Sequence, residues 1–184
     1  MEQWKIWLCL GLGLVLAGCQ QHSIHSAISS HKPAEAKAFI DKGVDIESRD
    51  KYGNTPLLIA SQYGDMESAR YLMAKGADVN ARNKEGMTPL LCASYAGNEP
   101  LVKLLLAKRV DVNSQNNDGW TSLSFAAYYG MADMTRLLLD HGAKVEVANK
   151  EGRTPLSYAI EFKFKEVANL LRASGAIEPG PKRQ

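Results

Sequence analysis

The chain has 184 residues, of which 45% are hydrophobic and 23% charged, and its formal net charge is +2. This composition is ordinary for a globular protein and excludes a disordered or strongly charged chain. Because there is no basic field to attract phosphates, nucleic-acid binding is not expected.

The first nineteen residues have the pattern of an export signal. An apolar run covers residues 6–17, which is shorter than the roughly 20 residues needed to cross a bilayer, so residues 1–18 are predicted to be a cleaved signal peptide. Leu16-Ala17-Gly18-Cys19 resembles the lipobox of bacterial lipoproteins. That resemblance implies that Cys19 becomes the first mature residue and accepts a lipid. The alternative is an uncleaved hydrophobic tail in which Cys19 is incidental.

The lipoprotein resemblance also implies a location. Each buried CH₂ of a lipid chain contributes roughly 0.8 kcal/mol, so two or three chains would hold the protein for practical purposes permanently. Gln20 follows the cysteine, in place of the Asp that retains such proteins in the inner membrane, and this favours the periplasmic side of the outer membrane. Residues 19–21 form the tether and span about 10 Å at most. The rest of the chain is therefore expected to work against the membrane surface.

A segment of 33 residues recurs through the rest of the chain. Its marker, Thr55-Pro56-Leu57, returns at 33-residue steps as Thr88-Pro89-Leu90, Thr121-Ser122-Leu123 and Thr154-Pro155-Leu156. This period and the recurring Thr-Pro-Leu marker resemble those of the ankyrin repeat, which is a β-turn followed by two short helices. The resemblance implies an all-α solenoid with β-turn fingers, an ankyrin-repeat stack of about five units.

The period divides the chain into five units and a tail. The first lacks the marker and has His22-Ser23-Ile24 in its place, so it is interpreted as a cap. The units are the N-terminal cap at 22–49, full repeats at 50–82, 83–115 and 116–148, a C-terminal cap at 149–178, and the tail at 179–184. A cap has one neighbour and needs a polar outer side. In the first unit the candidates are His22, His25, His31, Lys32, Glu35 and Lys37.

Each full unit repeats the same local chemistry. An Asp or Asn begins a turn that ends in Gly, the Thr of the marker caps the first helix, and Pro is tolerated in its first turn because that N–H has no helical partner. Ser122 replaces this Pro in the third full unit and is expected to soften the helix start slightly. Arg109 replaces a left-handed Gly, which costs about 1 kcal/mol and predicts a local weak point.

The cysteines and histidines do not indicate a catalytic or metal-binding site. Cys9 leaves with the signal, Cys19 is the lipid site, and Cys92 lies in a core column, so it is interpreted as a small buried residue. The three histidines of the first unit lack a ligand set with metal spacing, and solvated surface is the favoured interpretation over a metal site. No catalytic or phosphate-binding motif was found, and Asn116-Asn117-Asp118-Gly119 lacks the downstream Glu of a calcium loop. No cofactor, metal or enzymatic activity is predicted.

In ankyrin proteins the turn tips and the exposed side of the first helix form a concave surface that binds other proteins. Carried over position by position, the implied contact residues are Lys51, Tyr52, Asn54, Gln62, Tyr63, Lys84, Glu85, Met87, Tyr95, Asn117, Asp118, Trp120, Tyr128, Tyr129, Glu151, Arg153 and Phe162. Seven of these are aromatic, and Tyr and Trp are enriched at binding hot spots. Most are expected to share one face. The alternative is that some of them pack between neighbouring helices.

These observations predict a membrane-anchored periplasmic module that binds another protein on its concave face and has no catalytic activity. The chain resembles the ankyrin-repeat lipoproteins of Gram-negative bacteria, some of which are immunity proteins against secreted lipase or phospholipase toxins. The alternative is a scaffold or protective partner of a housekeeping envelope enzyme. The expected partners are another protein and, through the Cys19 lipid, the membrane, with neither nucleic acid nor a small-molecule substrate.

Overall fold

The computed structural model describes residues 23–108 and 110–178. Its ten helices form five consecutive pairs, and no strand occurs in these two segments. The pairs are α2 (Ile24–Ser29) with α3 (Pro33–Asp41), α4 (Pro56–Tyr63) with α5 (Met66–Ala74), α6 (Pro89–Tyr95) with α7 (Glu99–Leu106), α8 (Ser122–Tyr128) with α9 (Ala132–Asp140), and α10 (Pro155–Glu161) with α11 (Lys165–Ala173).

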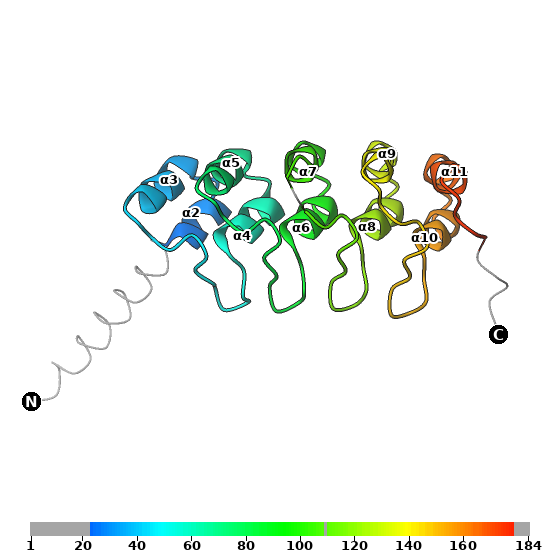
Figure 1. Ribbon diagram of the computed structural model, residues 1–184, viewed down its shortest axis with the longest axis horizontal. Coiled ribbons are helices and arrows are strands. Elements are labelled where there is room, and N and C mark those ends of the chain that lie inside the picture. The colour runs from blue at the N-terminus through cyan, green and yellow to red at the C-terminus, as the bar shows by residue number, and fades with distance from the viewer. Residues whose placement is uncertain (1–22, 109, 179–184) are drawn as a thin grey trace, which may run out of the picture.

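The helices stack in two layers (Figure 1). The first helices of the pairs lie in one layer, the second helices lie in the other, and each first helix packs on its neighbours along the stack. The connections between pairs project as fingers on the side of the first helices. We call the fingers and the first helices together the finger face. The predicted solenoid of five units is confirmed for the described residues.

The marker residues start the first helices as predicted. Thr55, Thr88, Thr121 and Thr154 each accept a hydrogen bond from the backbone N–H three residues on, at 3.1–3.4 Å. In the first unit the cap is Ser23, one residue later than the period predicts, and Ser23 and Ser26 exchange hydrogen bonds of 3.1 and 3.2 Å. Thr121 keeps its cap although Ser122 follows it.

Two residues at the ends of first helices were not anticipated. Gly64 ends α4 in the left-handed conformation, and the equivalent positions of the two end units hold His31, with φ +53°, and Lys163, with φ +61°. A non-glycine residue there costs roughly 1 kcal/mol. His31 is held by its side chain, because its Nε2 forms a 2.9 Å hydrogen bond with the carbonyl oxygen of Tyr63 in the next unit.

Other polar side chains of the first unit also form contacts within the stack. His25 Nε2 forms a 3.0 Å hydrogen bond with the carbonyl oxygen of Ser48, and the Lys37 ammonium lies 5.0 Å from the centre of the Tyr71 ring. His31 and Lys37, which are exposed, therefore also contact the next unit, whereas the partner of His25 lies in the first unit itself. Lys32 and Glu35 remain exposed and form a 3.0 Å ion pair with each other, and His22 lies outside the described residues.

One continuous apolar core runs along the stack. The marker leucines and their counterparts in the second helices are at most 1% exposed, and these are Leu57, Leu90, Leu123, Leu156, Leu72, Leu105, Leu138 and Leu171. Each such side chain contributes about 1.5–3 kcal/mol when buried. The prediction that Cys92 is a core residue is confirmed, since it is 6% exposed and packs with Leu58 and Ala81.

Hydrogen bonds join each finger to the next. Three backbone bonds of 2.9–3.1 Å run from the N–H groups of Lys84, Asn117 and Lys150 to the carbonyl oxygens of Tyr52, Glu85 and Asp118. The Arg49 guanidinium adds bonds to the carbonyl oxygens of Gly53 and Arg82, and Arg82 and Gln115 repeat this pattern one finger later each. The fingers therefore form one rigid row.

The predicted turn chemistry is also confirmed. Asp50 Oδ1 accepts the N–H groups of Tyr52 and Asn54 at 2.8 and 2.9 Å, and Asn83, Asn116 and Asn149 do the same in their fingers. In the turn Asn116-Asn117-Asp118-Gly119, Asn116 Oδ1 therefore serves as a backbone cap. No group of three or more potential metal-ligating side chains occurs within the described part of the chain.

Several predictions fall outside the described residues. They concern the signal peptide at 1–18, the lipid site Cys19 with its tether at 19–21, the weak point at Arg109, and the tail at 179–184. Among the helices that the structure does describe, none has the length and apolar character needed to cross a bilayer.

Candidate protein-binding surface

Eight aromatic rings of the last three helix pairs form one connected cluster on and beneath the finger face. We call it the aromatic cluster, and its members are Tyr95, Trp120, Phe125, Tyr128, Tyr129, Tyr158, Phe162 and Phe164. They come from α6, α8, α10, the finger before α8 and the residues that follow α8 and α10. Neighbouring centroids in the cluster lie 4.8–6.2 Å apart, the range in which aromatic pairs attract each other.

Trp120 is stacked on two buried rings of the cluster. Its ring stacks on Phe125 at 5.0 Å and on Tyr158 at 4.8 Å, with interplanar angles of 16° and 24°. Both supporting rings are buried, at 7% and 1% exposure. Asn149 Nδ2 donates a 2.8 Å hydrogen bond to the Tyr158 hydroxyl, and the Arg153 guanidinium lies 4.1 Å from the Tyr158 ring centre. The base of the cluster is therefore fixed.

The outer rings leave a large part of their surface to solvent. Tyr95, Tyr129 and Phe162 are 52%, 43% and 41% exposed. Tyr128 lies among them and meets Tyr129 and Phe162 edge-on at 4.9 and 5.0 Å. Burial, followed by a hydrogen bond with Tyr95, raises the pKa of the Tyr129 hydroxyl. The cluster offers rigid apolar surface with polar edges.

The two remaining predicted aromatics lie elsewhere on the finger face. The Tyr52 ring has the Lys51 ammonium 4.8 Å from its centre, and Tyr63 meets His31 edge-on at 6.3 Å. Both line a separate polar hollow of about 660 Å³ over the first two units. The seven predicted aromatics therefore divide into a connected group of five and a pair beside a polar hollow.

The structure places the other predicted contact residues mostly at the surface. Those exposed are Lys51, Gln62, Lys84, Glu85, Asn117, Asp118 and Glu151, while Met87, Trp120, Tyr128 and Arg153 are partly buried. Asn54 does not fit the prediction, because it is 8% exposed. Its Nδ2 donates to Asp50 and its Oδ1 accepts from Asn83 Nδ2 at 2.8 Å, so its side chain joins two fingers and is not free to contact a partner.

A family model decides what this architecture is. The model for ankyrin repeats in three copies matches residues 24–116 and again residues 90–182. The chain belongs to the ankyrin-repeat family. Ankyrin-repeat proteins generally serve as non-catalytic interaction scaffolds, and the stack is accordingly a protein–protein interaction module with a protein partner. A search of curated proteins found no match to this ankyrin chain.

Three members of the aromatic cluster were missed by the sequence analysis. Phe125 and Tyr158 share a repeat column with Ile59 and Cys92, which pointed to the core, and Phe164 precedes the second helix of the last ankyrin unit. The available signal was the replacement of Ile and Cys by aromatic residues in the last two units. These buried rings support the exposed ones.

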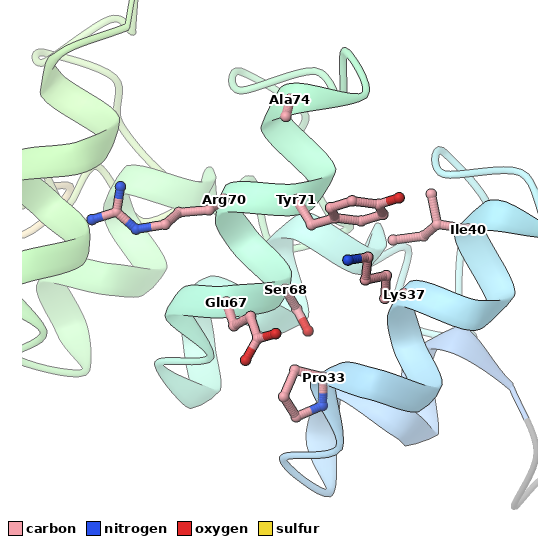
Figure 2. A pocket seen from close by; sticks show the side chains of 8 residues that line it. All are labelled: Pro33, Lys37, Ile40, Glu67, Ser68, Arg70, Tyr71 and Ala74. Atoms are coloured by element: carbon pink, nitrogen blue, oxygen red, sulfur yellow. The ribbon is translucent and has the colours of Figure 1, made fainter.

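A further groove lies in the layer of second helices (Figure 2). It has a volume of about 320 Å³ and lies between α3 and α5 of the ankyrin stack, with Lys37, Ile40 and Tyr71 in its lining. The Tyr71 hydroxyl donates to Asp41, and this hydrogen bond lowers the pKa of the Asp41 carboxyl. These contacts tie α3 to α5, so the groove is part of the packing between the first two units.

Proposed function

We propose that the chain binds a partner protein through the aromatic cluster while a lipid on Cys19 holds it at the periplasmic side of a bacterial outer membrane. The sharper form of the proposal is an immunity protein that neutralises a secreted lipase or phospholipase toxin. The observation that supports protein binding is the exposure of Tyr95, Tyr129 and Phe162 above a buried aromatic base, on the finger face of an ankyrin stack.

The cluster has the physical properties of a binding hot spot. Aromatic rings in a well-packed setting dominate the binding energy of many interfaces. Tyr95 packs on Phe125, and Tyr129 and Phe162 both pack on Tyr128. Because these contacts already hold the outer rings, little side-chain freedom is lost on binding. Ordering a free side chain would otherwise cost about 0.5–1.5 kcal/mol each.

The membrane part of the proposal is supported by the N-terminal sequence. Leu16-Ala17-Gly18-Cys19 resembles a lipobox, and only residues 20–22 separate the proposed lipid site from the first described residue, Ser23. Such a short tether would keep the first unit of the stack close to the membrane. A toxin that attacks lipids must reach the same surface.

Replacing Tyr95 and Phe162 together by Ala tests the surface. Both side chains are 41% or more exposed, so the fold should persist, whereas loss of two hot-spot rings should weaken partner binding at least tenfold. The full chain is used to capture proteins from the cell envelope, and the captured proteins are identified by mass spectrometry. Each captured candidate is then titrated with the wild-type and double-variant chains.

Two controls make the result interpretable. Tyr71→Ala removes an aromatic ring from the layer of second helices and should leave capture unchanged. Cys19→Ser reports whether capture needs the proposed lipid. A captured lipase that the wild-type chain inhibits supports the immunity role, and a captured housekeeping enzyme supports the protective role instead. Undiminished binding by the Tyr95→Ala, Phe162→Ala chain would remove the cluster as the binding surface.

A further inference from the structure

The polar hollow that Tyr52 and Tyr63 line lies next to the aromatic cluster on the finger face. Its walls come from α2, α4 and the fingers before α4 and α6. Gln62 lies in its lining one period before Tyr95, a member of the aromatic cluster, and α4 packs directly on α6. A partner that covers the aromatic cluster would therefore place its adjoining surface over the polar hollow.

Carboxylates outnumber ammonium groups in this lining. Its acidic side chains are Asp50 and Glu85, and its basic ones are Lys51 and His25. With His25 neutral, two negative charges are present with one positive charge at pH 7. The polar hollow therefore favours a cationic group of a partner over an anionic one.

The Glu85 carboxylate is available to such a cation. The main chain of Glu85 is fixed, because its N–H and its carbonyl oxygen form hydrogen bonds of 3.0 and 2.9 Å within the row of fingers. Its side chain is exposed, and in the described segments the carboxylate has neither a hydrogen bond nor an ion pair. The Asp50 carboxylate, in contrast, already accepts three hydrogen bonds of 2.8–3.0 Å from Tyr52 and Asn54. A donor from a partner would therefore meet Glu85.

Two exposed tyrosine rings supply the second kind of contact. Tyr52 and Tyr63 are 57% and 47% exposed. The Lys51 ammonium lies 4.8 Å from the centre of the Tyr52 ring, whereas no lysine or arginine of the described chain lies on the Tyr63 ring. A cation within about 6 Å of a ring centroid is attracted to the face of the ring. The Tyr63 ring therefore remains accessible to a cation from a partner.

We infer that the polar hollow receives an arginine side chain of the partner protein, whose guanidinium lies on the Tyr63 ring and donates to the Glu85 carboxylate. Arginine suits this lining better than lysine, because its planar guanidinium stacks on an aromatic ring and directs several donors to a carboxylate. Arg153 makes the first kind of contact within the chain, since its guanidinium lies 4.1 Å from the centre of the Tyr158 ring. The inference rests on the proposed function, because a partner must cover the finger face, and it adds a basic residue to the surface of that partner.

A blocked tripeptide tests the polar hollow without a known partner. Acetyl-Gly-Arg-Gly-amide is titrated into the full chain, and the backbone amide signals of Gln62, Tyr63 and Glu85 are followed by NMR. The control is acetyl-Gly-citrulline-Gly-amide, which has nearly the same shape and no charge. We expect saturable shifts of these three signals, with an affinity about fivefold higher for the arginine tripeptide than for the citrulline tripeptide.

Four single substitutions test the assigned contacts. Glu85→Gln removes the charge at nearly constant shape, Tyr63→Leu removes the ring, and each should weaken binding of the arginine tripeptide about fivefold. Lys51→Met removes a competing cation and should strengthen binding about twofold. Asp118→Asn is the matched control for Glu85→Gln, because Asp118 lies one period later and outside the polar hollow, so the affinity should not change.

Three results would overturn the inference. They are equal affinities for the arginine and citrulline tripeptides, tighter binding of acetyl-Gly-Glu-Gly-amide than of the arginine tripeptide, and equal weakening by Glu85→Gln and Asp118→Asn. The last result would show that the arginine tripeptide responds to the charge of the whole chain and not to the polar hollow.

The Tyr95→Ala, Phe162→Ala chain separates this test from that of the proposed function. Neither side chain lines the polar hollow, so the double variant should bind the arginine tripeptide as the wild-type chain does, even where it loses its partner. If the double variant loses its partner and the arginine tripeptide binds neither chain, the arginine site is refuted while the aromatic cluster stands.

Discussion

Cys92 shows how a repeat position determines the chemistry of a single residue. The side chain is 6% exposed, and burial raises the pKa of its thiol to about 12 from 9.0. The nearby Glu85 carboxylate acts in the same direction. Because the thiolate is the nucleophile, a raised pKa lowers the reactivity of this cysteine at neutral pH.

Cys92 is expected to resist alkylation while the protein is folded. At pH 8 the rise in pKa from 9.0 to about 12 reduces the thiolate fraction about a thousandfold, so iodoacetamide should label Cys92 at least a hundredfold more slowly than in the unfolded chain. Mass spectrometry of the Cys92 peptide, with and without denaturant, measures both rates. Equal rates would show that the thiol is accessible in the folded protein.

At the scale of single helices, α4, α6 and α8 each begin after the predicted Thr cap, and α8 differs in the residue that follows this cap. Its first residue is Ser122, where α4, α6 and α10 have Pro. Ser122 is fully buried, and its hydroxyl has no hydrogen-bond partner among the described residues. An unpaired buried hydroxyl costs about 1–3 kcal/mol. The third full unit therefore loses stability at this position.

Ser122→Pro is expected to stabilise the protein. The substitution removes the unpaired hydroxyl and lowers the entropy of the unfolded chain, a gain of about 0.4–1 kcal/mol for the entropy alone. Thr121, with φ −103° and ψ 167°, has the extended backbone that a following Pro requires. Urea unfolding measures the change, and Ser122→Ala isolates the hydroxyl. A Pro variant no more stable than the Ala variant would contradict the entropic part.

At the scale of the whole molecule, contacts between neighbouring units hold the stack together, as in other repeat proteins. Trp120 makes such contacts, because it stacks on Phe125 of its own unit and on Tyr158 of the next. Tyr52, which is 57% exposed, packs against the Lys51 ammonium beside it in the same finger. Two aromatic residues at finger positions thus have different structural roles.

Trp120→Ala is expected to lower the free energy of unfolding by about 3 kcal/mol, since it leaves a cavity between two rings. Tyr52→Ala should cost about 0.5 kcal/mol or less, as exposed substitutions usually do. Urea unfolding followed by circular dichroism measures both changes. If Trp120→Ala cost no more than Tyr52→Ala, the ring stack would not couple the last two units.

The sequence by itself determined the repeat, the Thr helix caps of the marker and the core. Thr55 and its counterparts, the finger turns and the buried leucines follow from contacts within three to five residues or from a periodic apolar face, so a single unit specifies them. The same local rules missed His31 and Lys163, because neither is the glycine expected at a left-handed position. For His31 the added contact is a hydrogen bond with Tyr63, 32 residues away.

Only the tertiary structure decided how the surface is built. Asn54 and the seven aromatics occupy similar positions in the period, yet Asn54 joins two fingers, five aromatics merge into one cluster, and Tyr52 and Tyr63 line a polar hollow. These differences depend on which side chains neighbouring units bring together across 29–33 residues of sequence. A repeat pattern determines where each side chain lies in its unit, but the packing of one unit on the next determines which other side chains it contacts.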